Sequence, residues 1–363
     1  MHVLVVNAGS SSLKLSSFDG GVRTGSETVE RWSGGELAPI ESFVRRMPAI
    51  EAVGHRVVHG GNVLTASVRI DENVIATIEG LNDLAPLHNP PAVAGMRDVG
   101  RLLPDVPAVA CFDTAFHAGL PPAARTYALP REWNARWQLR RFGFHGLSHA
   151  HAVRRGAEIV GRPVEDLRIV SCHIGAGASL AAVVGGRSVD TTMGFTPLEG
   201  LVMLSRSGSV DPGLLLWLVN RRGVSADHLA TVLSHESGLK GLSGTSGDLR
   251  DVLAGRAEGD ADCSLAFDVF VHRLRREIGA MTASAGGLDL LVFTGGVGEH
   301  QPELRSAVTE GLAQLGVVLD PSANAAAAAD ADVTRQGATV SSAVVTAAED
   351  REIARETHRL LSG

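Results

Sequence analysis

The sequence predicts an α/β protein built from two domains, and three observations support this prediction. The chain has 363 residues, a length typical of two domains of ordinary size. Short apolar runs alternate with segments of helical spacing in both halves of the chain. A plan of strand, glycine-containing turn and second strand occurs at residues 3–20 and again at residues 168–186. We therefore expect two domains of related architecture.

Apolar runs bounded by glycine or polar residues predict strands. They occupy residues 3–6, 108–112, 169–172, 179–184 and 290–293. Helical periodicity predicts helices over residues 265–281, 302–315 and 349–361. The alanine tract at 323–332 is also compatible with a surface helix, and we assign it no function.

Composition argues against several functional classes. The chain is 44% hydrophobic and 20% charged, with a net charge of -7 and no long run of like charges, so we expect no nucleic-acid or membrane partner. No stretch of 18 apolar residues and no signal-peptide pattern occurs, which favours a cytoplasmic location. Cys111, Cys172 and Cys263 are too scattered for a disulfide framework or a CxxC site. Cys111 and Cys172 lie inside apolar runs, and we expect these two to be buried thiols.

Three glycine turns follow apolar runs and suggest phosphate binding. The first lies in "VLVVNAGSSSLKLSSF" at 3–18, the second in "CHIGAGAS" at 172–179 and the third in "VFTGGVGEH" at 292–300. Glycine lets backbone N–H groups point at an anion, while serine hydroxyls and a lysine add donors and charge. The first turn lacks the GxxxxGK[ST] spacing of a P-loop, and no GxGxxG follows a strand. A plain hydrophilic turn is the alternative for any one of the three.

Further motifs make the chain resemble the acetate kinase family over nearly its whole length, in the family's order. They are "GHRVVHGG" (54–61), "APLHNPP" (85–91), "CFDTAFH" (111–117), "FGFHGLSH" (142–149), "GFTPLEGLVMLSRSGSVDPG" (194–213), "SGLKGLSGTSGDLRDV" (237–252) and "TAAEDREIARET" (346–357). The resemblance implies transfer of the γ-phosphoryl group of ATP to acetate or propionate. It also implies a duplicated ribonuclease H-like fold of the actin, sugar kinase and Hsp70 superfamily, with two domains around a nucleotide cleft, and a homodimer. The first domain would span 1–113 plus 350–363, and the second, at 114–349, would bind nucleotide and mediate dimerisation.

The resemblance assigns catalysis to Arg56, Asp113, His145 and Arg206. A carboxylate nucleophile must approach a negatively charged triphosphate, so positive charge and rigid placement supply most of the catalysis. A general base is unnecessary because acetate is already ionised near neutral pH. Simpler interpretations exist for each residue: a surface ion pair for the arginines, a helix N-cap for Asp113 and a core histidine for His145. A zinc site at His145, with His149 and His151 nearby, lacks further ligands at zinc spacing.

The same resemblance assigns Mg²⁺ to Asn7 and Glu349. It places the acceptor among Arg56, His88 and four apolar residues that would enclose a methyl group, namely Val58, Leu87, Phe144 and Pro197. Core packing is the alternative for those four. Such a pocket discriminates a single methylene by only ~1 to 3 kcal/mol, so we expect acetate as the first choice and propionate as a second.

Nucleotide binding is implied for four segments. The residues are Ser10, Ser12 and Lys14; His173, Ile174, Gly175, Ala176 and Gly177; Asp248, Leu249 and Arg250; and Gly296, Val297, Gly298, Glu299 and His300. The chain departs from the family pattern here. Ala176 and His300 replace usual asparagines, and Leu204-Ser205 replaces a usual Gly-Thr. The chain is also shorter than the family between residues 18 and 52.

We therefore expect a reversible, ATP- and Mg²⁺-dependent acetate kinase that works by direct in-line transfer. A propionate or butyrate kinase on the same fold is one alternative. A non-catalytic, actin-like nucleotide-binding module is another, and retention of the catalytic residues named above argues against it.

Overall fold

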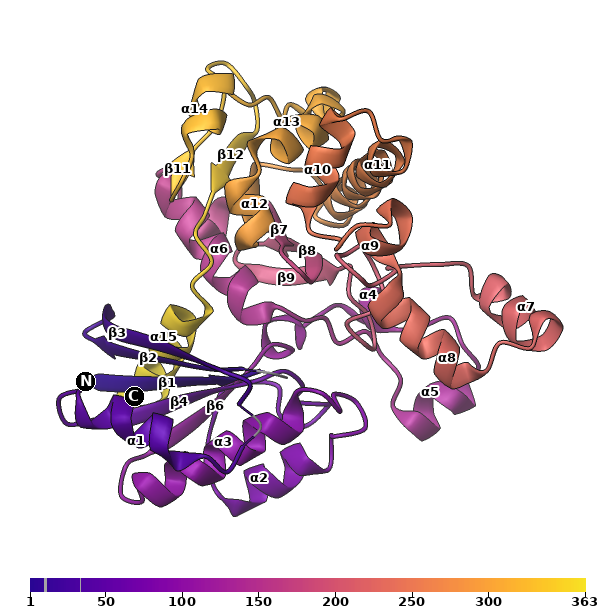
Figure 1. Ribbon diagram of the computed structural model, residues 1–363. Helices are drawn as coiled ribbons and strands as arrows, with labels where there is room; N and C mark the ends of the chain where they lie inside the picture. Colours follow the sequence, from indigo (N-terminus) through magenta and orange to yellow (C-terminus); the bar gives the residue numbers. More distant parts are fainter. Residues whose placement is uncertain (10–11, 33) are drawn as a thin grey trace. The chain divides into compact units, whose positions relative to one another are not determined.

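The computed structural model describes residues 1–9, 12–32 and 34–363, which form two compact units. The first unit comprises Met1–Ala118, Phe144–His151 and Ala348–Gly363, and the second comprises Gly119–Gly143 and Ala152–Ala347. The domain boundaries expected from the sequence, at 113/114 and 349/350, stay a prediction. Each unit contains its own six-stranded sheet (Figure 1).

The first sheet has the strand order β3-β2-β1-β4-β6-β5. Its strands are β1 (His2–Ala8), β2 (Ser12–Asp19), β3 (Val22–Glu30), β4 (Ala52–Val57), β5 (Val68–Arg69) and β6 (Ala108–Phe112). The first three strands form an antiparallel meander, and β1, β4 and β6 run parallel. The parallel strands therefore deliver their carboxyl ends to one edge of the sheet.

Helices cover both faces of the first sheet because β1 alternates its apolar side chains. Leu4 and Val6 belong to a core cluster with α1 (Leu37–Arg45) and α3 (Asn89–Leu102). Val3 and Val5 belong to another cluster with α15 (Glu349–Ser362) on the other face. The α2 helix (Glu72–Glu79) packs beside α3.

The second sheet repeats the first. Its order is β11-β12-β10-β7-β8-β9, again an antiparallel meander of three strands next to parallel strands and a short antiparallel edge. Its strands are β7 (Arg168–Ile174), β8 (Ala178–Val184), β9 (Arg187–Thr191), β10 (Leu290–Thr294), β11 (Ala331–Asp332) and β12 (Ser341–Val344). The shared order confirms the predicted duplicated α/β fold.

The two hairpins that suggested the repeat also match in detail. Asn7 and His173 are each the sixth residue of a seven-residue strand. Asn7 pairs with Lys14 across the first hairpin, and His173 pairs with Ser179 across the second. The hairpins differ in length by one residue, because Ala8 pairs with Leu13 and Ile174 with Ala178.

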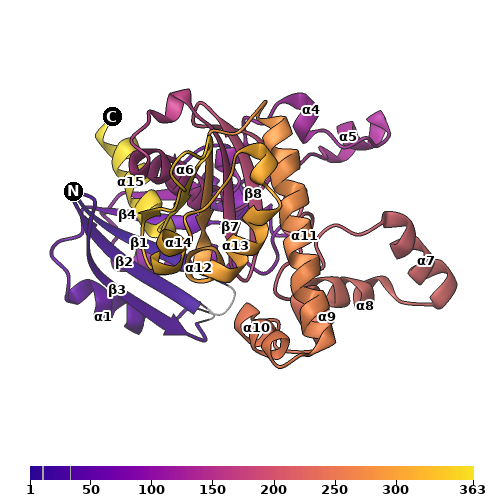
Figure 2. The ribbon, with the colours of Figure 1, turned by 90° about the horizontal axis from the view of Figure 1, so that it is seen from above.

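The long helix α11 (Ala261–Ser284) lies against β7, β8 and β9. Figure 2 shows it from above, beside β8. The other helices of the second unit are α4 (Pro122–Arg125), α5 (Arg131–Trp137), α7 (Pro212–Arg222), α8 (Ala226–Thr231), α9 (Gly238–Ser243), α10 (Leu249–Ala257), α12 (Gly295–His300), α13 (Pro302–Glu310) and α14 (Pro321–Ala326). Helix α6 (Gly146–Ile159) begins in the first unit and continues into the second.

All five strands predicted from apolar runs are present, and the predicted helices match α11, α13 and α15 with two differences. Helix α13 ends at Glu310, before the predicted end at 315. The alanine tract is helical only to Ala326. Beyond it the chain bends at residues 328–330 before β11, and Asp330 there accepts hydrogen bonds from Arg155 and from the N–H of Thr346.

Cys111 and Cys172 are buried thiols, as predicted, and Cys263 is buried as well. In the part of the chain that the structure describes, no helix combines the length and the apolar character needed to cross a lipid bilayer.

Candidate functional site

Four polar residues meet at the carboxyl edge of the first sheet and form what we call the arginine–carboxylate cluster: Asn7, Arg56, Asp113 and Glu349. The Arg56 guanidinium donates to both oxygens of Asp113, from Nε to Oδ1 at 3.2 Å and from Nη2 to Oδ2 at 2.7 Å. Its remaining nitrogen, Nη1, lies 3.4 Å from Asn7 Oδ1 and 3.3 Å from Glu349 Oε2. The Arg56 guanidinium thus contacts two carboxylates and an amide oxygen.

Strand register explains why these residues meet. Val6 pairs with His55, so Asn7 and Arg56 follow on neighbouring strands and share a face of the sheet. Asp113 is the first residue after β6, whose last residue pairs with Val57 of β4. The fourth member, Glu349, is the first residue of α15, where a carboxylate is also favoured by the helix dipole.

The cluster is largely shielded from water. Asp113 is only 1% exposed. Burial lowers the pKa of Arg56, but Asp113 and Glu349 raise it by more, so this guanidinium stays charged. Burial raises the pKa of Asp113, Arg56 opposes that rise by its charge and hydrogen bonds, and Glu349 adds to it. The net effect is a rigid cation held between two acids.

The donor set fits Mg²⁺. Asn7 Oδ1 and Glu349 Oε2 both lie within 3.4 Å of the same Arg56 nitrogen, so two hard oxygen ligands are already close together. Mg²⁺ needs few protein oxygens, because water and phosphate supply its other ligands. Among the described residues no group of three His, Cys, Asp or Glu side chains is placed to hold a metal, so neither a zinc site at His145 nor a complete cage for Mg²⁺ is formed by side chains of these types alone.

His145 is placed beside this cluster by the backbone. The N–H of Gly146 donates to the carbonyl of Asp113 at 2.9 Å, and a Cβ at position 146 would approach that carbonyl to 2.1 Å. His145 itself has a φ of 55°, in the left-handed region that side chains other than glycine seldom adopt. Such strain clusters at functional sites.

The predicted acceptor residues are distributed over both units. Phe144 is buried, with its ring against that of His59 at 5.5 Å, while Val58 is half-buried. Leu87 is 56% exposed and His88 directly precedes α3. Pro197 lies in the second unit.

The first hairpin presents the predicted phosphate ligands near Asn7. Lys14 is its cross-strand partner and is exposed, and Ser12 lies two residues away on the same face. Ser10, which was also predicted to bind nucleotide, lies outside the described residues.

In the second unit, two of the predicted nucleotide turns lie together. Gly175 closes its turn by donating to the carbonyl of Gly177 at 2.9 Å. Gly295, which begins α12, has a φ of 80°, and a Cβ there would lie 2.8 Å from the carbonyl of Ile174. The segment Gly296–His300 therefore starts against the end of the strand that carries His173.

Leu204 connects this region to Arg206. Its N–H donates to the carbonyl of Ala176 at 3.3 Å, so two of the departures from the family pattern are in direct contact. A Cβ at position 247 would lie only 2.6 Å from the carbonyl oxygen of Leu204, so the start of α10 lies close to Leu204. Arg206 donates from Nη1 to the carbonyl of Pro197 at 2.7 Å, and burial lowers the pKa of this guanidinium. No carboxylate pairs with Arg206 among the described residues.

Asp248 and Arg250 pair with each other. Asp248 accepts from Arg250 Nε at 3.0 Å and Nη2 at 2.7 Å, and it caps α10 by accepting from the N–H of Arg250. Hydrogen bonds from Arg250 lower the pKa of Asp248 to about 2. Leu249, between them, is buried. This pairing is also the geometry of an ordinary helix cap, so it does not by itself indicate a ligand.

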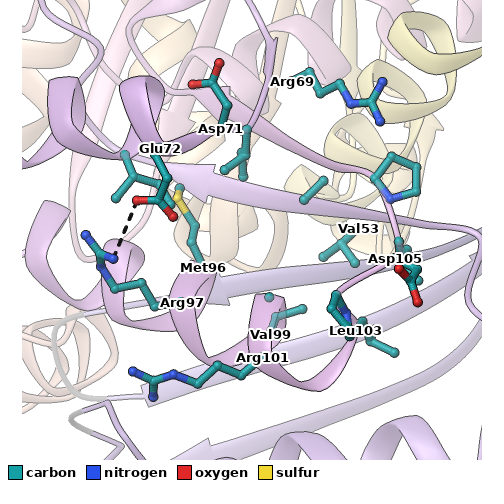
Figure 3. Close-up of a pocket in the computed structure, with 17 residues that line it drawn as sticks. Val53, Arg69, Asp71, Glu72, Met96, Arg97, Val99, Arg101, Leu103 and Asp105 are labelled. Carbon is teal, nitrogen blue, oxygen red and sulfur yellow. Dashed lines mark ion pairs between the residues drawn. The ribbon is translucent and has the colours of Figure 1, made fainter.

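A cavity of ≈ 570 Å³ opens in the first unit, but not at the cluster (Figure 3). It reaches Val53 and Ala108, near the amino ends of β4 and β6, whereas Arg56 and Asp113 lie at the carboxyl ends. Its rim mixes arginines with acids, including the pair of Arg97 and Glu72 at 3.8 Å. We therefore do not assign the chemistry to this cavity.

Sequence patterns missed a network around the chain's single tyrosine, Tyr127, with Arg141 and Glu199. These residues are far apart in the sequence, so no local spacing predicts their contact. The only available signal was that Glu199 lies in the same motif as Pro197 and Arg206.

Comparisons with known proteins found relatives that cover the whole chain. A model of the Acetokinase family matches residues 37–355. An acetate kinase of Synechococcus sp. (strain JA-2-3B'a(2-13)) is 46% identical over all of both chains, in an alignment of 404 positions. Among solved structures, an acetate kinase of Porphyromonas gingivalis is 34% identical with a TM-score of 0.91 over 99% of both chains. A propionate kinase of Francisella tularensis subsp. tularensis SCHU S4 is 32% identical with a TM-score of 0.90 over 99% of both chains.

Proposed function

Because the chain belongs to the Acetokinase family, we propose that it is an ATP- and Mg²⁺-dependent acetate kinase, which forms acetyl phosphate and ADP reversibly by direct in-line transfer. The observation that carries this proposal is the arginine–carboxylate cluster. A carboxylate acceptor needs a fixed cation, and Arg56 is a half-buried, permanently charged one whose orientation is set by Asp113.

Arg56 binds the acceptor carboxylate in this proposal, and Asp113 holds its guanidinium in place. Arg206 and His145 stabilise the charge on the transferring phosphoryl group. The absence of a carboxylate partner for Arg206 among the described residues supports its role, because its other N–H groups are then available to phosphoryl oxygens. The left-handed backbone of His145 supports a specific placement of its ring.

Asn7 and Glu349 would hold Mg²⁺, with Asp113 helping to organise metal and acceptor. The ion, when bound, neutralises the charge that develops on the phosphates. Lys14, Ser12 and Ser10 would lie near the transferring end of ATP, and the turns at 173–177, 248–250 and 296–300 would hold the rest of the nucleotide. Ala176 lacks the side-chain contact that the family's usual asparagine would make, but the backbone N–H groups of this turn can still donate to the nucleotide.

Acceptor preference is the finer part of the proposal. Val58, Leu87, Phe144 and Pro197, with His88, would enclose the methyl group. We expect kcat/KM for acetate to exceed that for propionate, by about 10- to 200-fold where the extra methylene meets the pocket wall. ADP release and hydroxamate-trapped acyl phosphate, measured with acetate, propionate, butyrate and no acceptor, test this order.

Each alternative predicts a different outcome in that assay. A preference for propionate or butyrate would reassign the chain to those kinases. ATP binding without acceptor-dependent turnover would instead indicate a non-catalytic nucleotide-binding module.

We also propose the homodimer, with the second unit as its interface, and a cytoplasmic location, where ATP is supplied. Helix α7 supports the dimer, because none of its residues is buried although Leu214, Leu216, Trp217 and Val219 are apolar. Contiguous exposed apolar residues of this kind are typical of protein interfaces. The two units would correspond to ribonuclease H-like domains at 1–113 plus 350–363 and at 114–349.

Leu216→Glu should convert the dimer into a monomer, since it places a charge in the apolar contact. Light scattering coupled to size exclusion measures the mass. Leu265→Glu is the matched control, because Leu265 is also exposed, at 55%, but lies on α11. A monomeric wild-type chain, or two variants that both remain dimeric, would rule out α7 as the interface.

A further inference from the structure

We propose that Tyr127, together with Glu199 and Arg141, positions Arg206 for phosphoryl transfer by fixing the loop at residues 195–199. The inference rests on the role proposed above for Arg206. All of the residues involved lie in the second unit, so their contacts are internal to one compact body.

The Tyr127 hydroxyl ties together both ends of this five-residue loop. It accepts a hydrogen bond from the N–H of Phe195 at 2.8 Å and donates one to Glu199 Oε2 at 2.7 Å. A hydroxyl is suited to this task because it donates and accepts at one atom. Phenylalanine at position 127 would lose both bonds and keep the ring.

The middle of the loop carries the carbonyl that holds Arg206. Pro197 lies between the two tied ends, and its oxygen accepts from Arg206 Nη1 at 2.7 Å. This is the guanidinium's one hydrogen bond to a described residue. The position of the Pro197 carbonyl therefore decides where the rest of the guanidinium points.

Arg141 braces the loop from the other side. Its Nη2 donates to Glu199 Oε1 at 2.6 Å, and its Nη1 donates to the carbonyl of Thr192 at 3.0 Å. Its guanidinium also lies 5.7 Å from the centre of the Tyr127 ring. Both carboxylate oxygens of Glu199 are thus occupied, one by each partner.

Gly194 shows how tightly this network is packed. A Cβ at this position would lie 1.7 Å from Glu199 Oε2 and 2.2 Å from the Tyr127 hydroxyl, so only glycine lets the three groups meet. Its carbonyl accepts from the N–H groups of Phe142 and Gly143, at 3.0 and 3.3 Å, which anchors the start of the loop. Burial, and then Glu199, raise the pKa of Tyr127, so its hydroxyl keeps its proton at neutral pH.

Tyr127→Phe should lower kcat by about 10- to 100-fold, because a misplacement of about 1 Å costs on that order. KM for ATP should change by less than about twofold, since the loop is not among the proposed nucleotide segments. Ser284→Ala is the matched control: it also removes a hydroxyl bonded to a carboxylate, Asp190 at 2.7 Å, on the exposed surface of the same unit. That variant should retain wild-type activity.

The decisive comparison is a double variant. If Tyr127 acts through Arg206, Tyr127→Phe should have no further effect on kcat in an Arg206→Ala background. Glu199→Gln, which keeps an acceptor for Tyr127 but weakens the bond to Arg141, should give a smaller loss than Tyr127→Phe. The inference would be overturned if the kcat of the double variant fell by the product of the two single-variant losses, or if Tyr127→Phe alone kept wild-type kcat.

A second measurement separates this inference from the proposed function. Phenylglyoxal modification of Arg206, followed by mass spectrometry, reports how firmly the guanidinium is held and requires no turnover. The rate should rise severalfold in Tyr127→Phe and not in Ser284→Ala. A wild-type chain without acetate-dependent turnover would overturn the proposed function, whereas an unchanged modification rate in Tyr127→Phe would overturn the positioning role.

Discussion

Replacing Arg206 with alanine should lower kcat by about a thousandfold or more while leaving ATP binding largely intact. An arginine that stabilises the transferring phosphoryl group contributes on this order, because its charge matters most in the transition state. The structure offers a reason for the selectivity. Arg206 is anchored by one carbonyl, that of Pro197, and no described carboxylate neutralises it. Its loss therefore removes a cation without leaving a buried acid unpaired.

Steady-state kinetics and calorimetric ATP binding would be measured on the same preparation. Arg187→Ala is the matched control, because this arginine is exposed on β9 and should be dispensable. Retained turnover in Arg206→Ala would remove this residue from the site. Equal loss of turnover and ATP affinity would indicate a nucleotide-binding role instead.

Arg56→Ala should abolish most activity and also lower the free energy of unfolding at pH 7 by ~3 to 5 kcal/mol. The structural cost arises because Asp113, which is 1% exposed, loses its partner and Glu349 remains nearby. Arg168→Ala is a control for the loss of an ion pair. Arg168 binds Asp289 at 2.8 Å but is 42% exposed, so its removal should lower the free energy of unfolding far less than Arg56→Ala does.

The loss in Arg56→Ala should depend on pH. In the native chain Arg56 lowers the pKa of Asp113 while burial raises it, so removing the arginine raises that pKa further. Below the ordinary pKa of an aspartate the carboxyl is protonated in both states, and the folded state pays no extra cost. As the pH rises above that ordinary pKa, Asp113 ionises in the unfolded chain before it ionises in the folded chain, and the unfolded state is favoured. Stability should therefore fall as the pH rises from about 4 towards the raised pKa.

Urea unfolding at several pH values measures this effect. The double variant Arg56→Ala/Asp113→Ala should regain stability near neutral pH but not activity. A pH-independent loss in the single variant would show that Asp113 is not the group left uncompensated.

Strands β1, β6, β7, β8 and β10 were predictable because they are apolar runs ended by glycine or polar residues. The strands that escaped prediction lack that pattern for physical reasons. Strand β3 is an exposed edge with polar residues along its length. Strand β4 contains glycine, histidine and arginine: Arg56 belongs to the site, and Gly54 leaves room for Ile353 and Thr357 of α15. Strands β5 and β11 have two residues each, too few to show a period.

The candidate site was predictable in its residue types but not in its geometry. The motifs identified Arg56, Asp113 and Glu349 as candidate site residues. Asp113 and Glu349 lie 57 and 293 residues from Arg56 in the sequence, however, and the three meet only through strand register and the return of α15. No feature of the sequence predicted the left-handed backbone conformation of His145. The contact of Tyr127 with Glu199, across 72 residues, likewise depends on tertiary folding.

The central claim is that this chain transfers the γ-phosphoryl group of ATP directly to acetate. Phosphorus NMR of the purified chain with ATP, Mg²⁺ and acetate follows that group most directly. We predict that the γ-phosphoryl signal is converted to acetyl phosphate, with one ADP formed for each, only when acetate and Mg²⁺ are both present. Conversion to inorganic phosphate without acetyl phosphate, or no acetate-dependent change, would contradict the account.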